Sequence, residues 1–154
     1  MEKIFQLNSE QATEVLAKQL AQLVFQPCII FLQGDLGAGK TTFVRYFIKS
    51  LNFQGFIKSP TYTLVETYEL SQMTIYHYDL YRLKTAAELE LIGIRDYFIK
   101  PAVHFIEWPE KGLQFLPNPD IIIQLAWLAD HSRKIVMTAN SALGTVLLTK
   151  IAEK

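Results

Sequence analysis

The stretch Gly34-Asp35-Leu36-Gly37-Ala38-Gly39-Lys40-Thr41 decides the fold that we expect for this chain. It matches the pattern Gly-x-x-x-x-Gly-Lys-Thr, in which glycines let the backbone curl tightly with its N–H groups facing inward. Residues 28–32 before it form an apolar run of strand length, and residues 42–51 after it place apolar side chains on one helical face. A strand, a glycine-rich loop and a helix in this order are typical of a phosphate-binding loop, the Walker A motif.

The fixed positions of this loop predict a nucleoside triphosphate with magnesium as the ligand. The N-terminus of the following helix favours an anion. Lys40 can reach the β- and γ-phosphates, and the Thr41 hydroxyl can ligate Mg²⁺. The loop alone does not distinguish a kinase from a hydrolase or a switch. A GTPase is less expected, because no Asn-Lys-x-Asp sequence that would read guanine occurs.

The composition indicates one folded domain. The chain has 154 residues, half of them apolar, so we expect a single domain over residues 1–154. With Cys28 as the only cysteine, an intrachain disulfide and a cysteine-based zinc cluster are excluded. The formal net charge is zero, whereas proteins that bind nucleic acid alone usually carry a basic excess, so we expect any contact with RNA to be weak, local or delegated to a partner.

No segment has the pattern of a membrane anchor or a secretory signal. Residues 1–6 lack a long apolar stretch behind a basic start. No apolar run approaches the roughly 20 residues that span a bilayer. We therefore expect a cytoplasmic protein without membrane association.

The rest of the chain predicts alternating strands and helices. Strands are expected over residues 4–7, 28–32, 62–70, 73–78, 103–107, 121–128 and 134–138, with a turn at 130–132. Helices are expected from a cap at Asn8 or Ser9 to Pro27, over 42–51, and from the capping box Thr85-Ala86-Ala87-Glu88 to about Phe98, while residues 146–151 are ambiguous. This pattern predicts an α/β fold: a single P-loop NTPase-like domain with a mixed, mainly parallel central sheet flanked by helices.

Two carboxylates follow predicted strands, where magnesium-dependent phosphoryl chemistry needs them. Glu107 comes directly after Val103-His104-Phe105-Ile106, the Walker B pattern of an apolar strand and then an acid, and Asp79 follows residues 74–78. An acid at a strand end can face the metal or its waters. Spacing does not decide which of the two approaches the metal and which positions water.

Residues 59–63, Ser-Pro-Thr-Tyr-Thr, form a predicted loop after the phosphate-loop helix. In P-loop switch proteins a loop at this position closes on the γ-phosphate, and here Thr61 or Thr63 could supply that contact. An ordinary turn that enters a strand is the alternative interpretation.

Three further side chains near these motifs have two interpretations each. His77 lies two residues before Asp79 and shares its strand face, so it could orient that carboxylate. His104, inside an apolar strand, is expected to be a hydrogen-bonded core residue. Trp108 could be a core aromatic or an anchor that faces a partner.

Four motifs occur in one order: Gly34 to Thr42, Ser59 to Val65, His77-Tyr78-Asp79-Leu80-Tyr81-Arg82-Leu83, and Glu107-Trp108-Pro109-Glu110. Together they closely resemble the bacterial TsaE (YjeE-like) family, the small P-loop ATPases of tRNA threonylcarbamoyladenosine (t6A) synthesis. The resemblance runs from about Asn8 to Glu110 and more loosely to the end, through Arg133 and the expected terminal strands.

The resemblance implies an ATPase that depends on Mg²⁺, slow alone and stimulated by partners. It implies that the chain acts with TsaD and TsaB, which move a threonylcarbamoyl group onto adenosine beside the tRNA anticodon, and that it primes or resets this complex. The tRNA would be met only indirectly. The implied catalytic residues are Lys40, Asp79 and Glu107, and the implied magnesium ligands are Thr41, Asp79 and Glu107. The implied nucleotide-binding residues are Gly34, Asp35, Leu36, Gly37, Ala38, Gly39, Lys40, Thr41, Thr42 and Thr61.

Two rival functions remain open from the sequence. A small-molecule kinase commonly clamps phosphates with arginines on a closing lid. The four arginines of this chain, Arg45, Arg82, Arg95 and Arg133, are widely scattered and predict no such lid. A nucleotide-dependent binding module with negligible turnover is the third possibility.

Overall fold

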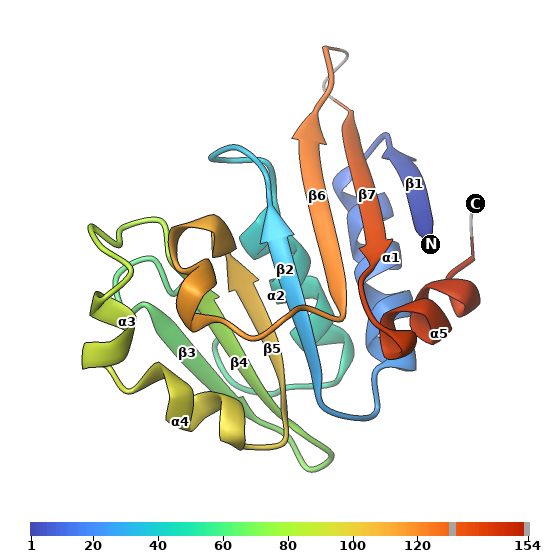
Figure 1. Cartoon of the computed structure of the whole chain (residues 1–154). Helices are drawn as coiled ribbons and strands as arrows, with labels where there is room; N and C mark the ends of the chain where they lie inside the picture. Colours follow the sequence, from blue (N-terminus) through green and yellow to red (C-terminus); the bar gives the residue numbers. More distant parts are fainter. Residues whose placement is uncertain (130–131, 153–154) are drawn as a thin grey trace.

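The computed structural model describes residues 1–129 and 132–152, and within them seven strands form one sheet (Figure 1). The strand order is β1-β7-β6-β2-β5-β4-β3. The strands are β1 (Glu2–Leu7), β2 (Cys28–Gln33), β3 (Val65–Glu69), β4 (Thr74–Asp79), β5 (Ala102–Glu107), β6 (Ile121–Trp127) and β7 (Arg133–Ala139).

Helices cover both faces of this sheet (Figure 1). The α-helices are α1 (Glu10–Leu23), α2 (Lys40–Ser50), α3 (Glu88–Leu91), α4 (Ile94–Ile99) and α5 (Ala142–Lys150), and two 3₁₀ turns are η1 (Pro109–Lys111) and η2 (Leu113–Phe115). Apolar side chains of α1, α2 and α5 form one core cluster with the sheet, and those of α3 and α4 form a second. None of the helices in the described ranges is long and apolar enough to cross a membrane.

The centre of the sheet is parallel and its edges are antiparallel. β6, β2, β5 and β4 run in one direction, whereas β7 and β3 run against their neighbours. β1 is antiparallel to β7 and so shares the direction of the central strands. The predicted mixed, mainly parallel sheet flanked by helices is confirmed.

The local signals that begin α1 and bury β2 act as predicted. Ser9, rather than Asn8, caps α1, because its hydroxyl accepts the backbone N–H of Ala12 at 3.2 Å. β2 is apolar from Cys28 to Leu32 because it pairs with parallel strands on both sides and is covered on both faces. Cys28 is 1% exposed in this strand, and burial raises the pKa of its thiol, which makes it a packing residue.

The predicted helix from Thr85 to about Phe98 is wrong as one element. It is split into α3 and α4 at Gly93, which has φ 69°. The capping box is half present: Glu88 Oε1 accepts the backbone N–H of Thr85 at 2.9 Å. A residue in the left-handed region ends a helix, and glycine adopts that region without a Cβ clash.

Two other predicted boundaries change. The strand expected from Tyr62 begins only at Val65, because Leu64 has φ 68° and its N–H is bonded to the Pro60 carbonyl in a turn. The ambiguous residues near the end belong to helix α5, whose N-cap Ser141 accepts from Gly144 N–H, so the last element is a helix and not a strand. The predicted turn at 130–132 includes residues 130 and 131, which lie outside the described residues.

His104 is the hydrogen-bonded core residue that its strand predicts. It is 2% exposed, and its Nδ1 lies 3.0 Å from the Tyr78 hydroxyl. Its ring stacks on that of Tyr76 at a centroid distance of 5.2 Å. Burial lowers the pKa of His104 to about 4, against a smaller opposite effect of a backbone hydrogen bond at Lys100.

The depressed pKa of His104 makes the stability of the fold depend on pH. Between pH 6.5 and pH 4 the unfolded chain takes up a proton at this residue and the folded chain does not, so stability is present above this window and lost as pH falls. We expect the free energy of unfolding in urea to be about 2 kcal/mol lower at pH 5 than at pH 7.5 from this group. The variant His104→Gln should lose that part of the pH dependence. An unchanged slope in the variant would contradict the assignment.

Candidate functional site

The glycine-rich loop joins the carboxyl end of β2 to the first turn of α2, as the sequence predicts. Gly34 has φ 140° and Gly37 has φ 80°, both in the region that favours glycine. At Gly34 a Cβ would lie 2.2 Å from the backbone oxygen of Leu125 in β6, so the loop passes directly against the neighbouring strand. Glycine is required there because no side chain fits between the two backbones.

A cavity of about 310 Å³ opens beside this loop. Its walls come from the loop, the first turn of α2, the ends of β4 and β5, and the segment around Thr61. The lining residues are Leu36, Gly37, Gly39, Lys40, Thr41, Thr42, Thr61, Asp79, Tyr81, Arg82, Glu107 and Trp108. The structure therefore brings three of the four sequence motifs and Thr61 of the remaining one to the same place.

Lys40 is held at the mouth of the loop. Its ammonium group donates to the carbonyls of Gly34 at 2.6 Å and Asp35 at 2.9 Å, and it lies 4.2 Å from the centre of the Trp108 ring. The side chain is 4% exposed. Burial lowers the pKa of Lys40, while the nearby Glu107 and Asp79 carboxylates act in the opposite direction. The ammonium thus sits in a low-dielectric environment, where it would bind a phosphate strongly.

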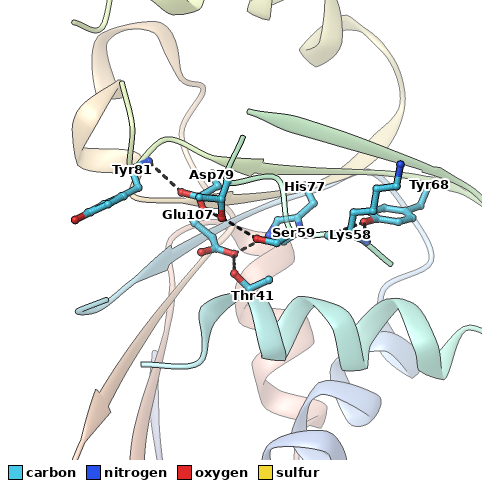
Figure 2. A network of polar contacts seen from close by, with 9 residues as sticks. Thr41, Lys58, Ser59, Tyr68, His77, Asp79, Tyr81 and Glu107 are labelled. Carbon is cyan, nitrogen blue, oxygen red and sulfur yellow. Dashed lines mark hydrogen bonds and ion pairs between the residues drawn. The ribbon is translucent and has the colours of Figure 1, made fainter. Parts of the chain in front are cut away.

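The two predicted acids lie side by side. Asp79 on β4 and Glu107 on β5 are register partners, and both are buried. The Thr41 hydroxyl donates to Glu107 Oε1 at 2.7 Å, which joins the start of α2 to the end of β5 (Figure 2). Asp79 accepts the backbone N–H of Tyr81 on Oδ1 at 3.0 Å.

His77 contacts Glu107 and not Asp79, the acid that the sequence suggested. Its Nε2 lies 2.8 Å from Glu107 Oε1, so the suggested contact with Asp79 is replaced by one with the neighbouring strand (Figure 2). In the β4–β5 register His77 is opposite Phe105, two residues before Glu107 on the same face. The side chain therefore reaches diagonally across the strand pair rather than along its own strand.

The loop at residues 59–63 reaches the site through one of its two threonines. Thr61 Oγ1 donates to Asp79 Oδ2 at 3.1 Å and is 2.8 Å from Ser59 Oγ. Thr63 instead donates to Glu66 at the start of β3. Of the two candidates for a contact with a bound phosphate, Thr61 is therefore the one placed at the cavity.

Trp108 is half-buried and packs against the second core cluster. It follows β5 in the left-handed region with φ 57°, and its half-buried ring lies between the Lys40 ammonium and the ring of Tyr81, 5.0 Å away. Left-handed backbone in a bulky residue is strained and is common at functional sites. The strain places the ring in the cavity wall.

The sequence patterns did not single out the residues that support the loop from the β6–β7 side. Trp127 at the end of β6 donates from Nε1 to the Gly37 carbonyl at 2.9 Å, and the Arg133 guanidinium lies 4.3 Å from the centre of the Trp127 ring. Arg82, one of the arginines that appear scattered in sequence, lies in the cavity wall and 4.5 Å from the ring of Tyr62. The signal that could have found Trp127 and Arg133 is their position at opposite ends of a predicted hairpin turn.

The donor set fits magnesium better than a softer metal. Among the described residues no group of three or more His, Cys, Asp or Glu side chains could hold a metal ion by itself. Thr41, Glu107 and Asp79 offer hard oxygen atoms at the cavity wall, and Mg²⁺ in nucleotide sites is typically bound by one or two such ligands together with phosphate oxygens and water.

The fold and the site together define a small α/β protein of the P-loop class. A family model described as "Threonylcarbamoyl adenosine biosynthesis protein TsaE" matches residues 7–135. The chain therefore belongs to the TsaE family, as the four motifs indicate.

Named relatives and a solved structure agree with this assignment. The tRNA threonylcarbamoyladenosine biosynthesis protein TsaE of Haemophilus influenzae is 46% identical over 121 residues, which cover 79% of this chain and 76% of that protein. The protein of the same name from Bacillus subtilis is 34% identical over 133 residues, 86% of this chain and 82% of its own. The crystal structure of Bacillus subtilis YdiB superposes with a TM-score of 0.84 at 26% identity, covering 98% and 94% of the two chains.

Two glycines of the loop provide a matched test of the close approach to β6. In Gly34→Ala the new methyl group meets the Leu125 carbonyl, whereas in Gly37→Ala it meets nothing within 4 Å, although both residues have positive φ. We expect Gly34→Ala to lower the free energy of unfolding by about 3 kcal/mol and Gly37→Ala by about 1 kcal/mol, measured in urea. Equal losses in the two variants would contradict the contact with β6.

Proposed function

We propose that this protein binds ATP with magnesium and hydrolyses it in the service of t6A biosynthesis, the process for which its family is named. The observation that carries the proposal is the hydrogen bond between Thr41 and Glu107, because it joins the last residue of the Walker A motif to the acid at the end of β5. Lys40 and the loop line the same cavity as this bond, and Asp79 is the register partner of Glu107. A loop, a cation and two acids in this order suit a triphosphate and an attacking water.

The loop would hold the phosphates. Backbone N–H groups of residues 34–39 and the N-terminus of α2 favour negative charge, and Thr42 extends this surface along the first turn. Lys40, now bonded to two loop carbonyls, would turn its ammonium to the β- and γ-phosphates, where charged partners replace neutral ones.

Thr41, Glu107 and Asp79 would hold the magnesium ion. A hydroxyl has one hydrogen and two lone pairs, so Thr41 can keep its bond to Glu107 and still offer an oxygen to the cation. When bound, the ion would supply positive charge that neutralises the negative charge developing on the phosphate oxygens. It would also offset the charge of two buried carboxylates beside a triphosphate.

Hydrolysis requires that a water attack the γ-phosphorus while the bond to the β-phosphate oxygen breaks, which releases ADP and phosphate. In this proposal Asp79 and Glu107 would orient that water. Thr61 is bonded to Asp79, so the loop at residues 59–63 would respond to occupancy of the γ-phosphate position. Such a response shifts the loop between states if the nucleotide binds one state better.

We propose the TsaD–TsaB complex as the partner that this response serves. In this hypothesis ATP turnover primes or resets the complex, and the chain transfers no threonylcarbamoyl group itself. The zero net charge supports contact with tRNA through the partners rather than directly.

A small-molecule kinase is the second candidate, and one observation favours it. Arg82 lies in the cavity wall, and a guanidinium group in that position can stabilise a phosphoryl group during transfer. A kinase would need a small acceptor for the phosphate, whereas a partner-stimulated ATPase would need TsaD–TsaB, and a pure binding module would release no phosphate with either.

Removal of the loop lysine tests nucleotide binding. Lys40→Ala should weaken ATP binding by about 100-fold, because a charge-assisted contact with the phosphates is lost. Isothermal calorimetry measures the affinity, and Lys49→Ala, an exposed lysine on the same helix, serves as the control. Equal ATP affinity of Lys40→Ala and the wild type would refute the assignment of this loop as the nucleotide-binding site.

Removal of either acid tests hydrolysis. With TsaD–TsaB present, Glu107→Gln and Asp79→Asn should each release phosphate at least about 100-fold more slowly than the wild type while keeping the native circular dichroism spectrum. Glu69→Gln, at the exposed end of β3, should retain the wild-type rate. Full turnover in one acid variant would deprive that acid of its role, and no partner-dependent phosphate release by the wild type would refute the proposal.

A further inference from the structure

A buried histidine contacts the site without facing the cavity. His77 is 1% exposed and is not among the residues that line the cavity, but its Nε2 lies 2.8 Å from Oε1 of Glu107, which is itself 3% exposed. It reaches this oxygen from β4, on the face of the sheet that α2 covers (Figure 2). His77 would therefore act on a bound nucleotide only through Glu107.

The chemistry of the contact assigns the hydrogen on the imidazole. An ionised carboxylate oxygen only accepts hydrogen bonds, so in a contact with ionised Glu107 the hydrogen lies on Nε2 of His77. Nδ1 is buried and has no hydrogen-bond partner among the described residues, which suits the ring nitrogen that has no hydrogen to donate. His77 is thus a donor directed at one atom.

Two donors meet at the same oxygen of Glu107. The Thr41 hydroxyl reaches Oε1 at 2.7 Å from α2, and His77 reaches it at 2.8 Å from β4. In the described part of the chain Oε2 has no protein partner. Because a carboxylate can rotate about its last bond, one donor fixes a distance, whereas two donors from different elements also fix the plane of the group.

We propose that His77 is a positioning residue, which holds Glu107 in the orientation that keeps Oε1 on Thr41 and turns Oε2 to the metal or its water. The inference rests on the proposed role of Glu107 in magnesium-dependent hydrolysis. Without His77, Glu107 would keep its charge but lose its fixed plane. The expected defect is therefore in metal binding and turnover, with nucleotide binding in the absence of metal unaffected.

A second buried histidine provides a matched control. His104 lies on the adjacent strand with similar burial, but it bonds to Tyr78 in the core cluster on the other face of the sheet. We expect its replacement to disturb the sheet to a comparable degree because its burial is similar, and its hydrogen bond is to Tyr78 rather than to Glu107. A loss that is shared by both histidines would be structural.

The experiment compares His77→Leu, His77→Gln and His104→Gln with the wild type. Calorimetry measures the affinity for the non-hydrolysable analogue AMP-PNP at increasing Mg²⁺ concentrations and without Mg²⁺. The quantity compared is the Mg²⁺ concentration at which half of the gain in affinity is reached. We expect His77→Leu to raise this concentration by about 10- to 100-fold and to lower kcat by a similar factor, with little change in metal-free binding. In His77→Gln the amide can donate to Oε1, so its half-saturating Mg²⁺ concentration and its kcat should both stay within about threefold of the wild type. The control His104→Gln should stay within the same range.

Two results would overturn the inference. One is a wild-type Mg²⁺ dependence in a folded His77→Leu protein, and the other is an equal loss in His77→Leu and His77→Gln. The proposed function and the role of His77 are tested by different measurements. Phosphate release by the wild type with TsaD–TsaB tests ATP hydrolysis, and the variants test what His77 does.

A measurement on the wild type keeps the test decisive if His77→Leu does not fold. Long-range ¹H–¹⁵N correlation spectra of ¹⁵N-histidine-labelled protein report which ring nitrogen carries the hydrogen. We expect His77 to carry it on Nε2, with slow exchange that becomes fast in Glu107→Ala. A hydrogen on Nδ1 with none on Nε2 would remove the donor to Glu107 and refute the inference.

Discussion

The site depends on the parallel register of β2, β5 and β4. Leu32 pairs with Glu107, and Glu107 pairs with Asp79. The loop after β2 and both carboxylates therefore meet at the carboxyl ends of the central strands. Backbone bonds extend this register past the strand ends, from Trp108 N–H to Leu32 at 3.2 Å and from Leu80 N–H to Glu107 at 3.1 Å. A slip by one residue would turn a carboxylate to the opposite face, away from the loop.

Charged side chains are concentrated at these strand ends, in a place that water reaches poorly. Asp79, Glu107 and Lys40 are all buried, and burial of an unpaired charge is costly, so each is held by specific donors or acceptors. Asp79 is bonded to Thr61 and to the backbone of Tyr81, Glu107 to Thr41 and His77, and Lys40 to loop carbonyls. A ligand that brings phosphate and a divalent cation would exchange these internal partners for stronger ones, which couples occupancy to the loop at Thr61.

The supports of the loop differ on its two sides. Toward β5, side chains that belong to the sequence motifs form the cavity wall. Toward β6, the Leu125 carbonyl approaches Gly34 and the Trp127 indole bonds to Gly37, so residues more than 85 positions later in the chain define the back of the loop. In the proposed function the same loop would therefore bind phosphate on its inside, while its outside packs against the backbone of β6.

The sequence by itself determined the elements whose signals are local: the strand-loop-helix around residues 34–41, a helix cap at Asn8 or Ser9, the acids that end β4 and β5, and the buried His104. Periodicity and capping depend on near neighbours, so they are readable before folding. Only the tertiary structure decided that His77 bonds to Glu107, that Trp127 and Arg82 lie at the loop and the cavity, and that Gly93 splits a helix. The physical reason is that side-chain partners across a sheet depend on strand order and register, which are properties of the whole chain and not of any segment.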